Sequence, residues 1–259
     1  MLDGSISELS FTSQGSGNPT LVFLHYFSGA AASWQWVMEE LKPSFRCITL
    51  DLPGFGNASP LAEPSLKNYS VFVREALVQL GMEQLVLIGH SMGGKIALQV
   101  AADMEADTLK RVILVAPSPP TQEPMPADER DRLLGNHHRS DVATTTVESA
   151  THKPLSDAQR TLAISTHNQA EDRTWRWWLL DGMNHSIADR LNNIKVPVGV
   201  IASADDPVIP LDTIKKDVMA LLPTAELTQL SGVGHLIPLE SPEQLAQNIR
   251  QMISSDQVS

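Results

Sequence analysis

Short, continuous apolar runs alternate with amphipathic stretches along most of this chain. Six runs have the length and the branched apolar composition of buried strands, at residues 21–24, 46–50, 84–88, 111–115, 196–202 and 226–230. Between or after them, apolar residues recur at helical spacing, at residues 31–41, 69–80, 92–102, 212–222 and 242–253. Strands that are apolar on both sides need cover on both faces, and the helices supply it. The pattern therefore predicts an α/β fold with a mostly parallel central sheet and helices on both faces.

The alternation stops between residues 118 and 194. This segment opens in a proline-rich stretch, continues with polar, helix-like sequence, and contains three tryptophans between residues 175 and 178. None of it has the strand pattern of its flanks, so we expect a helical cap inserted over the carboxyl edge of the sheet. A chain of 259 residues fits one large domain with such an insertion. We therefore expect a core domain, residues 1–117 and 195–259, and a cap, residues 118–194.

Charge and hydropathy argue against several classes of function. The formal net charge of −11 disfavours a nucleic-acid partner and attachment to anionic membranes, because both require a cationic face. No stretch approaches the roughly 18 apolar residues of a membrane span, and the first residues lack the pattern of a secretory signal. We expect a cytoplasmic protein, although an export signal removed from the sequence is compatible with this pattern. A monomer and a homodimer are equally compatible with it.

The most informative motif joins a predicted strand to a predicted helix. The strand leads directly into Gly89-His90-Ser91-Met92-Gly93, and the helix begins at Met92. A serine on such a sharp turn is exposed above the sheet, and side chains at the two glycine positions would crowd it. The positive end of the helix points at the turn, and the Met92 N–H can donate to an oxyanion. Ser91 is therefore the candidate nucleophile.

The strand, the sharp turn and the helix around this Gly-x-Ser-x-Gly motif resemble the α/β-hydrolase superfamily. The resemblance is to its serine-nucleophile, carboxylesterase-like branch with a helical cap, and it covers about residues 8–117 and 195–255. It does not extend to the cap. It implies that nucleophile, acid and histidine follow one another in this order along the chain.

A serine hydroxyl needs an adjacent base to act as a nucleophile at neutral pH. The loop at residues 232–235, which follows the last predicted strand, matches the family's histidine loop and makes His235 the expected base. Asp205 and Asp206 compete for the acid, and the family's D-x-x-x-P pattern favours Asp206. The acid would hold the imidazole tautomer and stabilise the imidazolium.

The resemblance also implies a second oxyanion donor after the first apolar strand. The family usually has His-Gly-x at this place, whereas this chain has His25-Tyr26-Phe27. By this alignment the Phe27 N–H is the donor that acts beside the Met92 N–H. Tyr26 stands where the family has glycine, so it either reshapes the loop or directs its hydroxyl into the pocket. We take it as a substrate-binding candidate.

Aromatic and imidazole groups elsewhere are weaker signals. Trp175 and Trp178 are substrate-binding candidates if they lie at the seam between cap and core, and otherwise form the cap's own core. The eight histidines show no repeated metal-ligand spacing, so we expect no metal site. His25 and His90 flank the site, and we interpret them as packing or hydrogen-bonding residues.

The sequence predicts a hydrolase that acts on a small-molecule ester, thioester or lactone through an acyl-enzyme on Ser91, without a cofactor. A small to medium hydrophobic substrate follows from analogy with capped relatives alone. Carbon–carbon bond hydrolases and cofactor-free perhydrolases have the same triad and stay as alternatives. Epoxide hydrolases and haloalkane dehalogenases need an aspartate at position 91. A ligand receptor with little turnover is the alternative from a different class, since such proteins can keep an intact triad.

Overall fold

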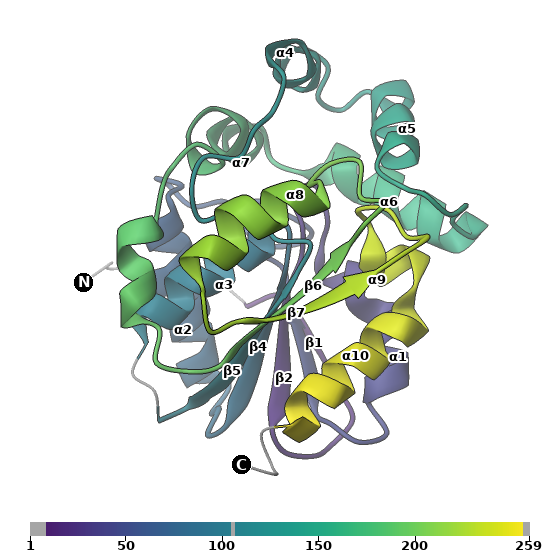
Figure 1. Cartoon of the computed structure of the whole chain (residues 1–259). Helices are drawn as coiled ribbons and strands as arrows, with labels where there is room; N and C mark the ends of the chain where they lie inside the picture. The colour runs from purple at the N-terminus through teal and green to yellow at the C-terminus, as the bar shows by residue number, and fades with distance from the viewer. Residues whose placement is uncertain (1–8, 105–106, 256–259) are drawn as a thin grey trace.

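The computed structural model describes residues 9–104 and 107–255. Its centre is a seven-stranded sheet in the order β1-β3-β2-β4-β5-β6-β7 (Figure 1). The strands are β1 (Phe11–Gln14), β2 (Thr20–Leu24), β3 (Cys47–Leu50), β4 (Leu85–His90), β5 (Leu109–Val115), β6 (Val198–Ser203) and β7 (Glu226–Leu230). β1 pairs with β3 in antiparallel orientation, and all the other pairs are parallel. The predicted α/β fold with a mostly parallel sheet is confirmed.

Alternate residues of each central strand face opposite sides of the sheet and enter different apolar cores. In β2, Leu21 and Phe23 belong to one core and Val22 and Leu24 to the other. The first core lies under helices α1 (Gln35–Leu41), α9 (Ile237–Glu240) and α10 (Pro242–Ser255). The second lies under α2 (Leu66–Gln79), α3 (Met92–Asp103) and the helical stretch formed by α8 (Leu211–Thr213), η4 (Ile214–Val218) and η5 (Met219–Leu221). Strands buried on both faces explain the continuous apolar runs in the sequence.

All six predicted strands are present, with ends that differ by at most two residues from those expected. The five predicted helices are present too. The one predicted at residues 31–41 consists of the 3₁₀ turn η1 (Ala31–Trp34) followed by α1, and the one predicted at residues 212–222 is the composite stretch of α8, η4 and η5. The sequence analysis missed β1. Three of its four residues are exposed, so this edge strand carries no apolar run, and its pairing with β3 is a tertiary contact.

Residues 118–194, all of them described, contain helices and no strand. The helices are α4 (Ala127–Gly135), α5 (Ser140–Ser149), α6 (Asp157–Gln169), α7 (Asp172–Trp177), the π-helical turn η2 (Trp178–Gly182) and the 3₁₀ helix η3 (Ala188–Asn193). Figure 1 shows α4, α5, α6 and α7 together at one end of the molecule, away from the C-terminus. The segment contacts the loop after β7, where the His235 N–H donates to the Ala150 carbonyl over 2.8 Å.

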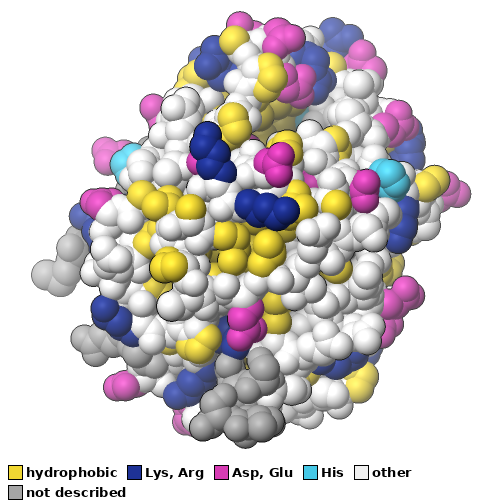
Figure 2. Space-filling model, in the orientation of Figure 1, with side chains coloured by type: hydrophobic (Ala, Val, Ile, Leu, Met, Phe, Trp, Pro, Cys, Tyr) yellow, Lys and Arg dark blue, Asp and Glu magenta, His cyan; other side chains and the backbone are white. Residues whose placement is uncertain are grey.

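Within the described ranges, no helix combines the length and the apolar character that crossing a membrane requires. Figure 2 shows acidic and basic side chains interspersed over one face, between hydrophobic and neutral polar groups. The expected absence of nucleic-acid and membrane partners, and the cytoplasmic location, stay predictions.

Candidate active site

Ser91 lies on the turn between β4 and α3, at the carboxyl edge of the sheet. Its φ of 53° is in the left-handed region, which costs free energy for a residue with a side chain. The two neighbouring glycines make the turn possible. A Cβ at Gly89 would lie 2.3 Å from the Gly93 carbonyl oxygen, and a Cβ at Gly93 would lie 2.5 Å from that of Leu24. The strained turn projects the Ser91 side chain above the sheet, and the helix behind it directs free N–H groups the same way.

Three of the expected site residues meet in a hydrogen-bonded chain. His235 Nε2 lies 3.0 Å from Ser91 Oγ, and His235 Nδ1 lies 2.8 Å from Asp206 Oδ2. The second carboxylate oxygen of Asp206 accepts the N–H groups of Val208 and Ile209, over 2.8 and 2.9 Å. This fixes the carboxylate, so the ring can hold its proton on Nδ1 and leave Nε2 free to accept the Ser91 proton.

Asp205, the competing acid, lies elsewhere. Its carboxylate accepts the Gly232 N–H over 2.6 Å, and its own N–H donates to Ser203 Oγ. Asp205 therefore connects the loop after β6 to the loop that carries His235, and Asp206 alone of the two contacts the imidazole.

The electrostatic surroundings of His235 favour the imidazolium. Burial by itself would lower the pKa of His235, but the charge of Asp206, its hydrogen bond, and the charges of Glu123 and Glu240 outweigh that effect and raise it. Neighbouring His90 shows the opposite result. Burial and the nearby His235 charge hold the pKa of His90 well below its ordinary value, so this ring stays neutral and its Nε2–H donates to the His235 carbonyl over 2.8 Å.

The two expected oxyanion donors lie on the loops that flank Ser91. Met92 is the first residue of α3, and Phe27 follows β2. Among the described residues, neither backbone N–H donates a hydrogen bond within the protein. The Phe27 loop is held by His25, whose Nδ1–H donates to the Tyr26 carbonyl over 2.8 Å while its Nε2 accepts the Leu52 N–H over 3.1 Å. His25 and His90 thus act through hydrogen bonds to the backbone.

A cavity of 340 Å³ opens above Ser91 and His235. Its lining includes the three substrate-binding candidates, Tyr26, Trp175 and Trp178. Phe27 connects core and helical segment there, since its ring lies 4.4 Å from that of Trp175 and 6.2 Å from that of Trp178. Residues 123–178 supply much of the wall, so the helical segment shapes the space in front of the nucleophile.

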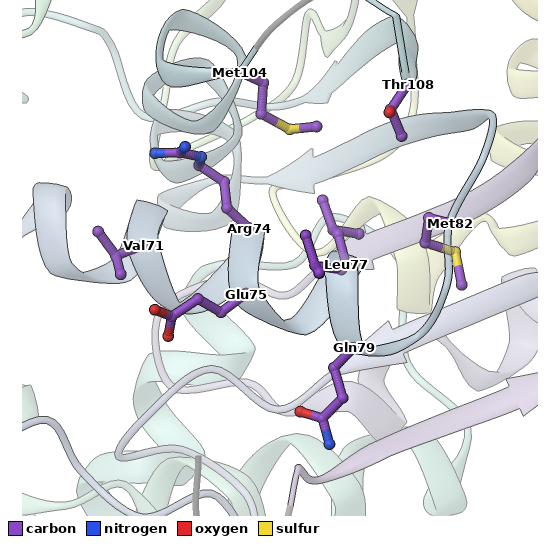
Figure 3. A pocket seen from close by; sticks show the side chains of 9 residues that line it. Val71, Arg74, Glu75, Leu77, Gln79, Met82, Met104 and Thr108 are labelled. Carbon is purple, nitrogen blue, oxygen red and sulfur yellow. The ribbon is translucent and has the colours of Figure 1, made fainter. Parts of the chain in front are cut away.

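The structure has a second large cavity, of 510 Å³, at the opposite edge of the sheet (Figure 3). It lies beside α2, and Met82 and Thr108, which come just before β4 and β5, are part of its wall. Among its described lining residues there is no serine, cysteine or histidine. The cavity at Ser91, in contrast, has a serine and a histidine in its wall, so we take that cavity as the candidate active site.

Three potential metal ligands lie together in the helical segment. His137 Nδ1, His138 Nε2 and an Asp172 carboxylate oxygen are within 4.8 Å of one another. The two rings lie 2.7 and 2.9 Å from that oxygen, at hydrogen-bond distance. The group ties the turn after α4 to the start of α7 by hydrogen bonds. We assign no metal to it, and the expected absence of a metal site stays a prediction.

The cavity wall includes polar residues that were not predicted from the sequence, among them Glu123. It is buried, at 6% exposure, and the Lys95 ammonium behind Ser91 lies near enough to influence its pKa. Glu123 follows no motif and lies in an irregular proline-rich stretch, so only its position in the folded chain identifies it.

Comparisons with known proteins bear on the family and the fold of the chain. The sequence profile of the alpha/beta hydrolase family matches residues 21–248. The chain is 27% identical to the uncharacterized hydrolase YugF of Bacillus subtilis, over 93% of this chain and 92% of that protein. It is 35% identical to the pimeloyl-acyl-carrier-protein methyl ester esterase of Vibrio vulnificus, over 44% of this chain and 42% of the esterase. The chain thus spans less than half of the length of that relative.

A solved structure of an esterase from Exiguobacterium antarcticum has the same fold. It superimposes with a TM-score of 0.83 at 18% identity, over 95% of this chain and 94% of that one. At this identity the likeness extends to the fold alone.

Proposed function

The chain belongs to the alpha/beta hydrolase family, as a hydrolase with esterase-type relatives, and from this premise we propose that it is a serine hydrolase of carboxylic esters, thioesters or lactones. The observation that carries the proposal is the hydrogen-bonded chain from Ser91 through His235 to Asp206, at 3.0 and 2.8 Å. It lies in the wall of a cavity large enough for a small substrate.

In the proposed mechanism, Ser91 Oγ attacks the substrate carbonyl carbon while His235 Nε2 takes the hydroxyl proton. The N–H groups of Phe27 and Met92 donate to the oxyanion of the tetrahedral intermediate. His235 then gives its proton to the leaving alcohol or thiol, and the acyl group stays on Ser91. A water activated by His235 attacks this acyl-enzyme, and the acid leaves. These groups suffice for the reaction, so it needs no cofactor.

We further propose that residues 118–194 form a cap that selects the substrate. The cap supplies Trp175 and Trp178 to the cavity, and their rings contact that of Phe27, whose N–H is one of the two proposed oxyanion donors. Large aromatic side chains bind apolar acyl or alkoxy groups well. A volume of 340 Å³ suits an acyl chain of small to medium length.

The first test is a panel of p-nitrophenyl esters from acetyl to octanoyl, followed by labelling with a fluorophosphonate. We expect multiple turnover, loss of activity in step with labelling, and a single adduct that peptide mapping assigns to Ser91. Each alkyl length then reports on the fit of the acyl group in the cavity. Absence of turnover and of adduct in the folded protein would contradict the esterase proposal and favour a carbon–carbon hydrolase, a perhydrolase or a receptor.

The pH dependence of kcat/KM supplies a second prediction. The base acts as neutral imidazole, and the charge of Asp206 raises the pKa of His235 above its ordinary 6.5 although burial opposes this. Activity should therefore fall as the pH drops through that raised value, and the acid limb should have its midpoint above pH 6.5. A midpoint clearly below this value, with a substrate that does not ionise, would contradict the assignment of His235.

A further inference from the structure

Glu123 places a carboxylate in the wall of the Ser91 cavity without a counter-ion. The residue is 6% exposed and lines the cavity together with Ser91 and His235. Its Oε2 is buried, and the neighbouring donor that acts on this carboxylate through a hydrogen bond is the neutral hydroxyl of Ser118, which supplies no charge. A buried carboxylate without a counter-ion is costly, because burial removes its hydration, so buried charges in native proteins are usually paired.

The Lys95 ammonium does not satisfy this carboxylate. Lys95, four residues after Ser91, directs its Nζ to the carbonyls of Thr121 and Met183, over 2.8 and 3.0 Å. Among the described residues, no ion pair within 4.0 Å joins it to Glu123. Lys95 thereby joins the backbone at Thr121 to the backbone at Met183, both within residues 118–194. Its charge acts on Glu123 through space, without a hydrogen bond or an ion pair between the two side chains.

The described part of the cavity wall holds no permanent positive charge. Among its described lining residues there is no Lys or Arg, and its other carboxylate, Glu129, pairs with Arg132 at 2.6 Å. Aromatic side chains line the same space, namely Tyr26, Phe27, Trp175 and Trp178. Aromatic faces together with an unpaired carboxylate are the features that bind an ammonium group, since both attract a cation in a desolvated site.

We infer that Glu123 forms a subsite for a protonated amine, so that the preferred substrates are esters that carry a cationic, hydrogen-bond-donating group. The inference rests on the proposed esterase function only where it calls the substrate an ester. The subsite itself is a binding property and can be measured without turnover. Burial raises the pKa of Glu123, while the Ser118 hydroxyl and the charges of His235 and Lys95 oppose the rise. An incoming ammonium adds a further positive charge, which favours the ionised carboxylate.

The test compares ligands of equal shape and different charge. Dimethylaminoethyl butanoate and isoamyl butanoate differ by a protonated nitrogen in place of a CH group, and p-nitrophenyl esters of an ω-dimethylamino acid and its carbon isostere form a second pair. Binding to the Ser91→Ala variant is measured by calorimetry at pH 7. In at least one pair we expect the cationic ester to bind about tenfold more tightly, as for a hydrogen bond between charged groups.

Two variants on the Ser91→Ala background assign the preference to Glu123. Glu123→Gln keeps the shape and removes the charge, and it should abolish most of the tenfold preference. Glu129→Gln removes a carboxylate that already has a partner, and it should leave most of the preference in place. A change in the ratio of the two affinities separates recognition from a general structural effect, which would weaken both ligands alike.

Equal affinity for both members of both pairs would overturn the inference, as would a preference that survives Glu123→Gln. Tighter binding of a neutral hydroxyethyl ester than of the cationic ester would also overturn it. These outcomes do not depend on turnover. If wild-type protein hydrolyses neutral esters while no preference exists, the esterase proposal stands alone; if the preference exists without turnover, the subsite stands and the esterase proposal fails.

Discussion

Ser91→Ala should lower kcat for the best p-nitrophenyl ester by about 10⁴- to 10⁶-fold, the effect of removing the nucleophile of a serine triad. The substitution deletes the oxygen that lies 3.0 Å from His235 Nε2 and leaves the rest of the cavity in place. Alanine also has a Cβ, so the strain of the turn at φ 53° is the same in both proteins. Substrate affinity should therefore change little, and the loss should appear in kcat.

Ser118→Ala is a matched control for this experiment. Ser118 is fully buried, and its backbone N–H donates to the Ser91 carbonyl over 3.1 Å, so it lies directly beside the site. Its hydroxyl has no contact in the proposed mechanism, and kcat should stay within about fivefold of wild type. The residual rate is measured in stopped assays that contain enough protein to detect about a millionth of the wild-type rate. This sensitivity is needed to distinguish true residual activity from contamination by wild-type protein. Activity above a tenth of wild type in Ser91→Ala would exclude Ser91 as the nucleophile.

The parts of the molecule that could be predicted from the sequence are those with a local cause. The strands are apolar runs because the sheet is covered on both faces, and Ser91 is marked by the glycines that its turn requires. The edge strand β1 has no such signal, because its exposed residues gain their structure only by pairing with β3.

The cavity wall is the other part that the sequence leaves open. Its residues come from loops and short helices of the cap whose positions depend on tertiary contacts, such as the bond of the His235 N–H to the Ala150 carbonyl. Trp175 and Trp178 are candidates because aromatic residues of the inserted segment can lie at its seam with the core, and both line the cavity. Glu123 is not a candidate from the sequence. A single carboxylate among prolines is ordinary in a loop, and it is unusual only when it is buried.

Asp206→Asn should lower kcat by about 10⁴-fold, because it reverses the direction of one hydrogen bond. The asparagine oxygen can still accept the N–H groups of Val208 and Ile209, which holds the side chain in the same place. Its amide nitrogen then faces His235 Nδ1, so the ring keeps its proton on Nε2 and cannot accept one from Ser91. The variant also removes the main charge that raises the pKa of His235.

Asp205→Asn is the matched control, since it makes the same chemical change one residue earlier. The asparagine oxygen can still accept the Gly232 N–H, and the side chain does not contact the imidazole, so kcat should stay within about fivefold of wild type. Both variants are compared at several pH values, with thermal unfolding to establish that each is folded. Equal losses in the two variants, or a larger loss in Asp205→Asn, would contradict Asp206 as the acid and return the assignment to Asp205.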